Sequence, residues 1–81
     1  MEKTLGQKRV KADFNPDKNG TVDKIKNKAA ELIDLIEVAK WEHYEEQGCK
    51  PPSSERARVG DIAQQGIETA CMYAVKTCFI D

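Results

Sequence analysis

The chain has 81 residues and a formal net charge of −1, with three cysteines and one third of its residues charged. This length fits one small domain, in which a single core supplies only about 3–5 kcal/mol. The odd number of cysteines argues against a secreted, disulfide-framed mini-protein and favours a reducing cytoplasm. No apolar run approaches the roughly 20 residues that cross a bilayer, and the N-terminus lacks a signal peptide's apolar core. We therefore expect a cytoplasmic protein without a membrane partner.

The charges are distributed unevenly along the chain. Residues 1–28 carry a net charge of +4, so the remaining residues carry −5. A basic first third can form a local anion-binding site, or it can simply be a solvated surface that keeps the protein soluble. The charge distribution alone does not decide between these two readings.

The first predicted element is an arm over residues 1–20, either extended or containing a short helix, whose apolar residues Leu5, Val10 and Phe14 dock on the body. Asn15-Pro16 is typical of a turn or a helix start, and Thr21 is the expected N-cap of the helix over 21–46. This helix carries an apolar stripe at helical spacing. Its members are Val22, Ile25, Ala29, Leu32, Ile33, Ile36 and Ala39.

Gly48 and Pro51-Pro52 end that helix, which predicts a loop over 47–54 and a second helix over 55–78. The second helix has a stripe of its own, comprising Ile62, Ala63, Ile67, Ala70, Cys71, Ala74, Val75 and Cys78. The predicted fold is all-α: an N-terminal arm or short helix, followed by a two-helix antiparallel hairpin. Two helices cannot enclose a core, so we expect the chain to assemble with copies of itself or with another partner.

The motifs of the common enzyme classes do not occur in this chain. It has no phosphate-binding glycine loop, no dinucleotide fingerprint and no Gly-x-Ser-x-Gly elbow. The single histidine, His43, and the loop-side Cys49 lack a third group that would orient a nucleophile and its base. The cysteines and His43 also lack the short spacings of zinc ligands. The sequence therefore predicts a protein that is not an enzyme and needs no metal or cofactor.

A candidate binding site lies where the arm meets the first long helix. Lys24, Lys26 and Lys28 fan around the first turns of that helix, and Phe14 lies just upstream across the Asn-Pro turn. An aromatic ring beside lysines is suited to stacking a base and neutralising a phosphate. The net charge of −1 and the lack of a recognition helix argue against duplex nucleic acid as the partner.

Short motifs distributed over nearly the whole chain together carry a family resemblance. They are Lys8-Arg9-Val10, Phe14-Asn15-Pro16, Val22, Ile25-Lys26 and Ala30-Glu31-Leu32-Ile33-Asp34, and then Arg58, Ala63, Gly66, Glu68, Ala70, Met72 and Ala74-Val75-Lys76. With these motifs the chain resembles the small phage proteins that share the anti-CBASS and anti-Thoeris hairpin domain. Those proteins are cyclic-nucleotide sponges, which bind the second messengers of bacterial immune enzymes without cleaving them.

The resemblance implies a homohexamer in the bacterial cytoplasm that holds cyclic dinucleotides in pockets between protomers. Lys26 matches the lysine that contacts phosphate. Phe14 is the nearest match to the family's stacking aromatic, which is often a tyrosine. If the gap in the alignment to the family is placed differently, that position falls on Lys8 or Arg9. Lys8, Arg9 and Lys24 are expected as supporting cations. Arg58 matches an arginine near a second site, for cyclic trinucleotides, in some relatives.

Two other hypotheses remain open. The small residues Gly60, Ala63, Gly66, Ala70 and Ala74 give the second helix a face for close helix packing, which suits a module that binds a host or phage protein. The other hypothesis is a nucleotide hydrolase, which would degrade its bound ligand. Binding to a panel of cyclic nucleotides, followed by recovery of the ligand, separates the three.

Overall fold

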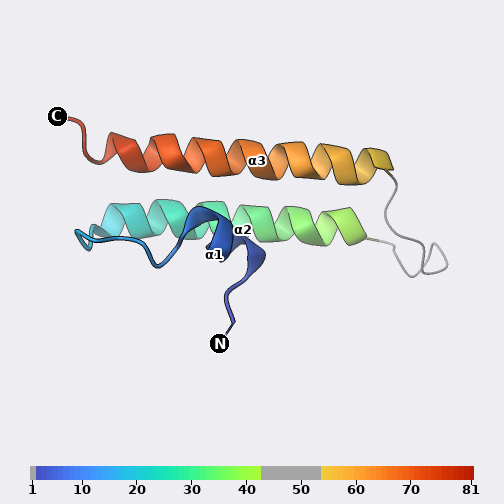
Figure 1. Cartoon of the computed structure of the whole chain (residues 1–81), viewed down its shortest axis with the longest axis horizontal. Coiled ribbons are helices and arrows are strands. Elements are labelled where there is room, and N and C mark those ends of the chain that lie inside the picture. The colour runs from blue at the N-terminus through green and yellow to red at the C-terminus, as the bar shows by residue number, and fades with distance from the viewer. Residues whose placement is uncertain (1, 43–53) are drawn as a thin grey trace.

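The structure, a computed structural model, describes residues 2–42 and 54–81. These residues form three helices, α1 (Leu5–Val10), α2 (Gly20–Trp41) and α3 (Ser54–Thr77), and no strand. Figure 1 shows α2 and α3 side by side and running in opposite directions, with α1 crossing in front of α2. The all-helical prediction is confirmed, and α3 agrees with the predicted 55–78 to within one residue at each end.

The boundaries of the other predicted elements agree with the structure only in part. The arm over 1–20 contains the short helix α1, and α2 begins one residue before the predicted start at 21. Helix α2 ends at Trp41, with Glu42 as its C-cap, so it stops short of the predicted end at 46. Residues 43–46, most of the loop over 47–54, and with them His43 and Cys49, lie outside the described residues. None of the described helices is long and apolar enough to cross a membrane.

Side chains of the arm fix the starts of both α1 and α2. Thr4 and Gln7 form a reciprocal capping box at α1, with distances of 3.1 Å and 2.9 Å between side chain and backbone. At α2 the cap is Asn19, whose side chain accepts from the amides of Thr21 (2.9 Å) and Val22 (3.2 Å). The prediction that Thr21 is the cap is therefore wrong. An asparagine oxygen one residue before the helix reaches both free amides.

Helix α1 packs on α2 at very short range. A Cβ added to Gly6 would lie 2.7 Å and 2.8 Å from the carbonyl carbon and Cα of Ala30, and closer still to its carbonyl oxygen. The Gly6 amide also donates to Asp34 Oδ1 at 2.7 Å. Only glycine lets the two backbones approach this closely, so this one residue sets where α1 crosses α2.

The apolar core is small and lies among the three helices. Its buried members are Val10, Ala30, Ile33 and Cys71, with Ile25, Ala29, Ile67 and Val75 packed around them. The predicted stripes locate this core only in part. Several of their residues are exposed instead of buried, namely Leu32, Ala39, Ile62, Ala63 and Ala70. Two polar side chains outside the stripes, Lys26 and Gln64, are buried.

A hydrogen-bonded cluster joins α2 to α3 beside this core. Gln64, 1% exposed, donates to the Ile33 carbonyl (3.2 Å) and to Glu37 (3.1 Å). Lys40 lies between Glu37 (3.2 Å) and Asp61 (2.7 Å) and forms an ion pair with each. Hydrogen bonding from Gln64 lowers the pKa of the Glu37 carboxyl, and Asp61 raises the pKa of Lys40. A buried amide with specific partners fixes how the two helices align.

Candidate functional site

Lys26 stands at the centre of the predicted site, but its first role is structural. Its side chain is buried, and its ammonium donates to the Lys11 carbonyl at 3.0 Å and to the Phe14 carbonyl. These bonds tie the segment that follows α1 to helix α2. A lysine ammonium has three donors, so one donor remains for a further acceptor.

Phe14 lies directly against that ammonium. The Lys26 nitrogen is 5.5 Å from the centre of the Phe14 ring, within the range of a cation–π contact. The ring is still 66% exposed, which leaves it surface on which a base can stack. It also lines a hollow of about 290 Å³ together with Lys26, Val75 and Phe79, the last an exposed aromatic beyond the end of α3. The structure thus joins the two residues that the sequence singled out and adds a second ring.

A larger hollow of about 430 Å³, which Lys26 and Val75 also line, lies between the end of α1 and helix α3. Three cations line it, Arg9, Lys11 and Lys26, against a single carboxylate, Glu68. Val10, Cys71, Met72 and Val75 supply its apolar walls. A cationic excess within apolar walls suits an anion that also carries an apolar or aromatic part.

Arg9 is incompletely paired within this hollow. Its Nε lies 4.0 Å from Glu68 Oε2, at the limit of an ion pair. Its Nη1 is buried and has no hydrogen-bond partner among the described residues. Buried donors are nearly always paired in folded proteins, so this guanidinium nitrogen needs an acceptor from outside the described protein atoms, either a water molecule or a ligand oxygen.

The cysteine in the wall of this hollow behaves as an apolar residue. Burial raises the pKa of the Cys71 thiol, and the positive charge of nearby Lys26 opposes that shift with a smaller effect. A thiol with a raised pKa stays protonated at neutral pH and is a poor nucleophile. Among the described residues, no group of His, Cys, Asp and Glu side chains is arranged to hold a metal ion.

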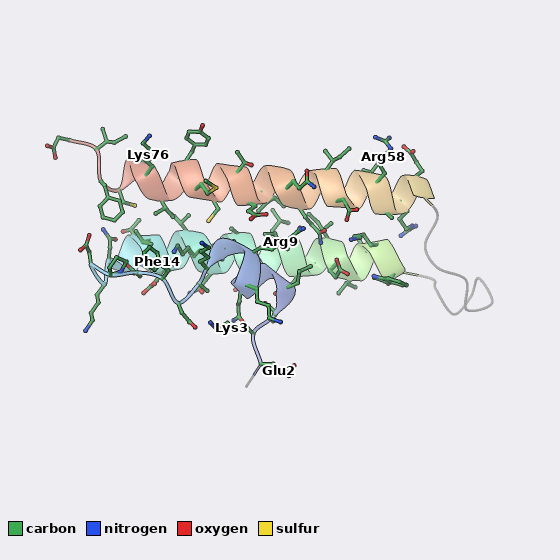
Figure 2. All side chains as sticks on the ribbon, in the orientation of Figure 1. Glu2, Lys3, Arg9, Phe14, Arg58 and Lys76 are labelled. Atoms are coloured by element: carbon green, nitrogen blue, oxygen red, sulfur yellow. The ribbon has the colours of Figure 1, made fainter. Side chains whose placement is uncertain are left out.

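The remaining predicted site residues divide between this region and other parts of the surface. Lys8 lines a third hollow of about 340 Å³ with Phe14, Lys11 and the Lys3–Asp13 ion pair (2.6 Å). Lys24 is exposed on α2 and lines none of these three hollows. Arg58 forms a two-point ion pair with Glu55 on α3, at 2.6 Å and 3.2 Å. Figure 2 shows it far along α3 from Phe14 and Arg9.

The structure therefore gathers Lys8, Arg9, Phe14 and Lys26, and leaves Lys24 and Arg58 apart. It also adds three residues that the sequence did not single out as site residues. Lys11 ends α1 with a positive φ of 54°. Glu68 reaches the site from α3, and Phe79 reaches it from beyond the predicted end of the second helix. Of these three residues, only Glu68 is among the positions that carry the family resemblance, so only it could have been found from the sequence.

Comparisons with protein-family models, with curated proteins and with solved structures find no match for this chain. The fold and the site by themselves define a small helical protein with a cationic, partly aromatic surface around the α1–α2 junction.

Proposed function

We propose that this protein binds cyclic oligonucleotide second messengers and holds them without cleaving them, as the phage sponges that it resembles do. Acting in the bacterial cytoplasm, it would keep the free messenger below the level that activates a CBASS effector. The observation that carries this proposal is the buried, unpartnered Nη1 of Arg9 beside a hollow that Lys11 and Lys26 also line. A phosphate oxygen is the acceptor that best matches a guanidinium and two ammonium groups.

The aromatic residues supply the other half of the recognition. Phe14 is mostly exposed and lies against Lys26, and it lines a neighbouring hollow together with Phe79. Stacking on an aromatic ring contributes about 1–3 kcal/mol per base and tolerates different bases. One nucleotide would therefore lie across two neighbouring hollows, with its phosphate on the cations of one and its base on the ring that lines the other.

A cyclic dinucleotide has two phosphates and two bases, whereas one copy of this chain offers one set of these groups. Two sites related by a two-fold axis would contact both halves of the ring equally. The proposal therefore includes a homo-oligomer, the hexamer that the resemblance implies, with ligands between copies. Sequestration depends only on affinity and on the number of protein copies, so it requires no catalytic group.

Calorimetric titration with a panel of cyclic di- and trinucleotides tests the proposal. Arg9→Gln should raise the Kd at least tenfold, because a charge-assisted hydrogen bond contributes about 1.5–3 kcal/mol. Phe14→Ala should raise it at least about fivefold, because a stacked base contributes about 1–3 kcal/mol. Lys28→Ala removes an exposed lysine from the same helix as Lys26 and is the matched control. If the Kd of Arg9→Gln and the Kd of Phe14→Ala both equal that of the Lys28→Ala control, the assignment of the site is contradicted.

Two further outcomes separate this proposal from its alternatives. Intact messenger should be recovered when the complex is denatured by heat, whereas a hydrolase would release cleaved product. Exposed Ala63 and Ala70 on α3 favour the protein-binding module as the second candidate, since small surface residues permit close helix packing. Failure of every nucleotide in the panel to bind would favour that candidate.

A further inference from the structure

The hollow beside Phe14 combines buried residues with two exposed aromatic rings. Val22 and Lys26, one turn apart on α2, are 2% and 6% exposed and line it. Phe14 and Phe79, which line it too, are 66% and 54% exposed. Buried residues lie at the bottom of a surface hollow and exposed residues lie at its edge. The two rings therefore stand at the rim, above a floor that α2 provides.

The two rings reach this hollow from separate segments, each with a fixed backbone. Phe14 belongs to the arm before α2, and Phe79 follows the end of α3; Figure 1 shows the start of α2 and the end of α3 at the same end of the molecule. The Phe14 amide donates to the Lys11 carbonyl (2.8 Å), and the Phe14 carbonyl accepts from Lys26. The Phe79 amide donates to the Lys76 carbonyl (3.0 Å). Both rings are thus positioned before a ligand binds, which lowers the entropic cost of binding.

The charge of this hollow differs from that of the cationic hollow next to it. The described residues that line it carry one charge of each sign, from Lys26 and Asp17. The cationic hollow has three positive side chains and one carboxylate. Lys26 and Val75 line both hollows, so the two adjoin. A phosphate is therefore drawn to the cationic hollow, and an uncharged group attached to that phosphate fits the hollow between the rings.

The size and the polar groups of the hollow narrow the choice of that uncharged group. Its volume of about 290 Å³ is at the lower end of the roughly 300–1,000 Å³ of small-molecule sites, so it suits one base and is too small for a whole dinucleotide. The side-chain amide of Asn15, which also lines it, donates to the Asn19 carbonyl (2.7 Å) and to Asp23 (2.8 Å). Because both amide hydrogens are used, Asn15 has no donor left for the edge of a base, and the rings become the main contacts.

We propose that Phe14 and Phe79 together bind one purine base, with Phe79 as a second aromatic contact to that base. This role rests on the proposed function and names the part of the ligand that the hollow takes. A purine has two fused rings, so it offers two phenyl rings more contact area than a pyrimidine does. A base that contacted Phe14 alone would leave the Phe79 ring exposed to water.

The base site predicts a preference among messengers. A cyclic dinucleotide with two purines presents a base of the preferred size whichever half of it binds. A cyclic dinucleotide with two pyrimidines has the same two phosphates but fills the space between the rings less completely. The protein should therefore distinguish messengers by the size of their bases, because stacking strength depends on the base.

Calorimetric titration with cyclic di-AMP and cyclic di-UMP tests this base site. The wild type should bind cyclic di-AMP more tightly. Phe79→Ala and Phe79→Leu should each raise the Kd for cyclic di-AMP at least about fivefold and the Kd for cyclic di-UMP by less. Leucine keeps an apolar side chain without a ring, so the second variant separates stacking from packing. Ile80→Ala is the matched control, since Ile80 is 66% exposed, lines neither hollow and should be replaceable without loss of binding.

Two results would overturn the purine site and leave the proposed sequestration standing. One is equal binding of both cyclic ligands by the wild type, and the other is binding of cyclic di-AMP by the Phe79 variants as tight as by Ile80→Ala. Proton NMR of AMP mixed with the protein separates the two proposals further, because stacking on aromatic rings shifts the purine protons upfield. If neither cyclic ligand binds, an AMP shift that Phe79→Ala abolishes supports the base site and refutes the sponge. If AMP also shows no shift, both are refuted.

Discussion

Gly6→Ala is the substitution for which this fold makes its sharpest prediction. The added methyl group would lie 2.7 Å from the Ala30 carbonyl carbon and 2.8 Å from its Cα, where contacts between real atoms are rarely closer than about 3.4 Å. Neither neighbour can rotate away, since both belong to the backbone of α2. The six-residue helix α1 must therefore shift as a unit or leave its place.

The expected cost follows from two terms. Overpacking of a tight contact costs about 1–3 kcal/mol. A shift of α1 also strains or breaks the 2.7 Å bond from the Gly6 amide to Asp34, and bonds to a charged group contribute about 1.5–3 kcal/mol. The gain in helix propensity from alanine, at most about 1 kcal/mol, offsets part of this. A net loss of about 2–4 kcal/mol corresponds to a fall in Tm of about 8–32 °C for a domain of this size.

Thermal unfolding followed by circular dichroism measures the loss, and hydrogen exchange shows where it acts. The amides of α1 should lose protection first, because an isolated helix this short is not stable in water. Gly20→Ala is the matched control, since its added Cβ would meet nothing within 4 Å. If Gly6→Ala melts at the wild-type temperature with α1 still protected, the close backbone contact is refuted.

Three further predictions concern the charged residues. The pKa of Glu37 is lowered, chiefly by the bond from Gln64, so its contribution to stability is present above its ordinary value of 4.5 and is lost as the pH falls through the lowered pKa. The Tm advantage of wild type over Glu37→Gln should accordingly be largest near neutral pH and shrink below pH 4.5. Glu68→Gln should lower the Kd for a cyclic dinucleotide about threefold to tenfold, by removing the one carboxylate from the cationic hollow; weaker binding would show that Glu68 is needed to orient Arg9. Lys26→Met keeps the buried stem but removes the ammonium, so proteolysis should cleave the segment after α1 faster than in Lys28→Met, and equal rates would contradict the clamp.

The sequence was sufficient to predict α3 and the start of α2 to within one residue, because long apolar stripes at helical spacing have no other regular structure that buries them. It could not predict which side of each stripe is buried. Both long helices are apolar over a wide arc, and the position of α1 decides which part of that arc lies inside. Leu32 and Ile33 are adjacent in sequence, yet Leu32 is 47% exposed and Ile33 is fully buried.

For a related reason, the sequence could not predict which polar residues are buried. Gln64 and Lys26 interrupt the stripes, and a polar residue in such a position normally lies at the surface. Each is buried because a partner in a different segment satisfies it: the Ile33 carbonyl and Glu37 for Gln64, and the carbonyls of the segment after α1 for Lys26. Pairings across such distances in the chain leave no periodic signal in a single sequence.

Lys26 is the residue at which the fold and the candidate site depend on each other. Its two carbonyl bonds fix the segment that runs from Lys11 to Phe14, and that segment carries both a cation of the larger hollow and the exposed ring. A preorganised site loses less conformational freedom when its ligand binds, so a clamp of this kind raises affinity even where the ammonium itself makes a single contact with phosphate. The arm, which is too short to fold alone, thus gains its shape from the same lysine that gives the site part of its charge.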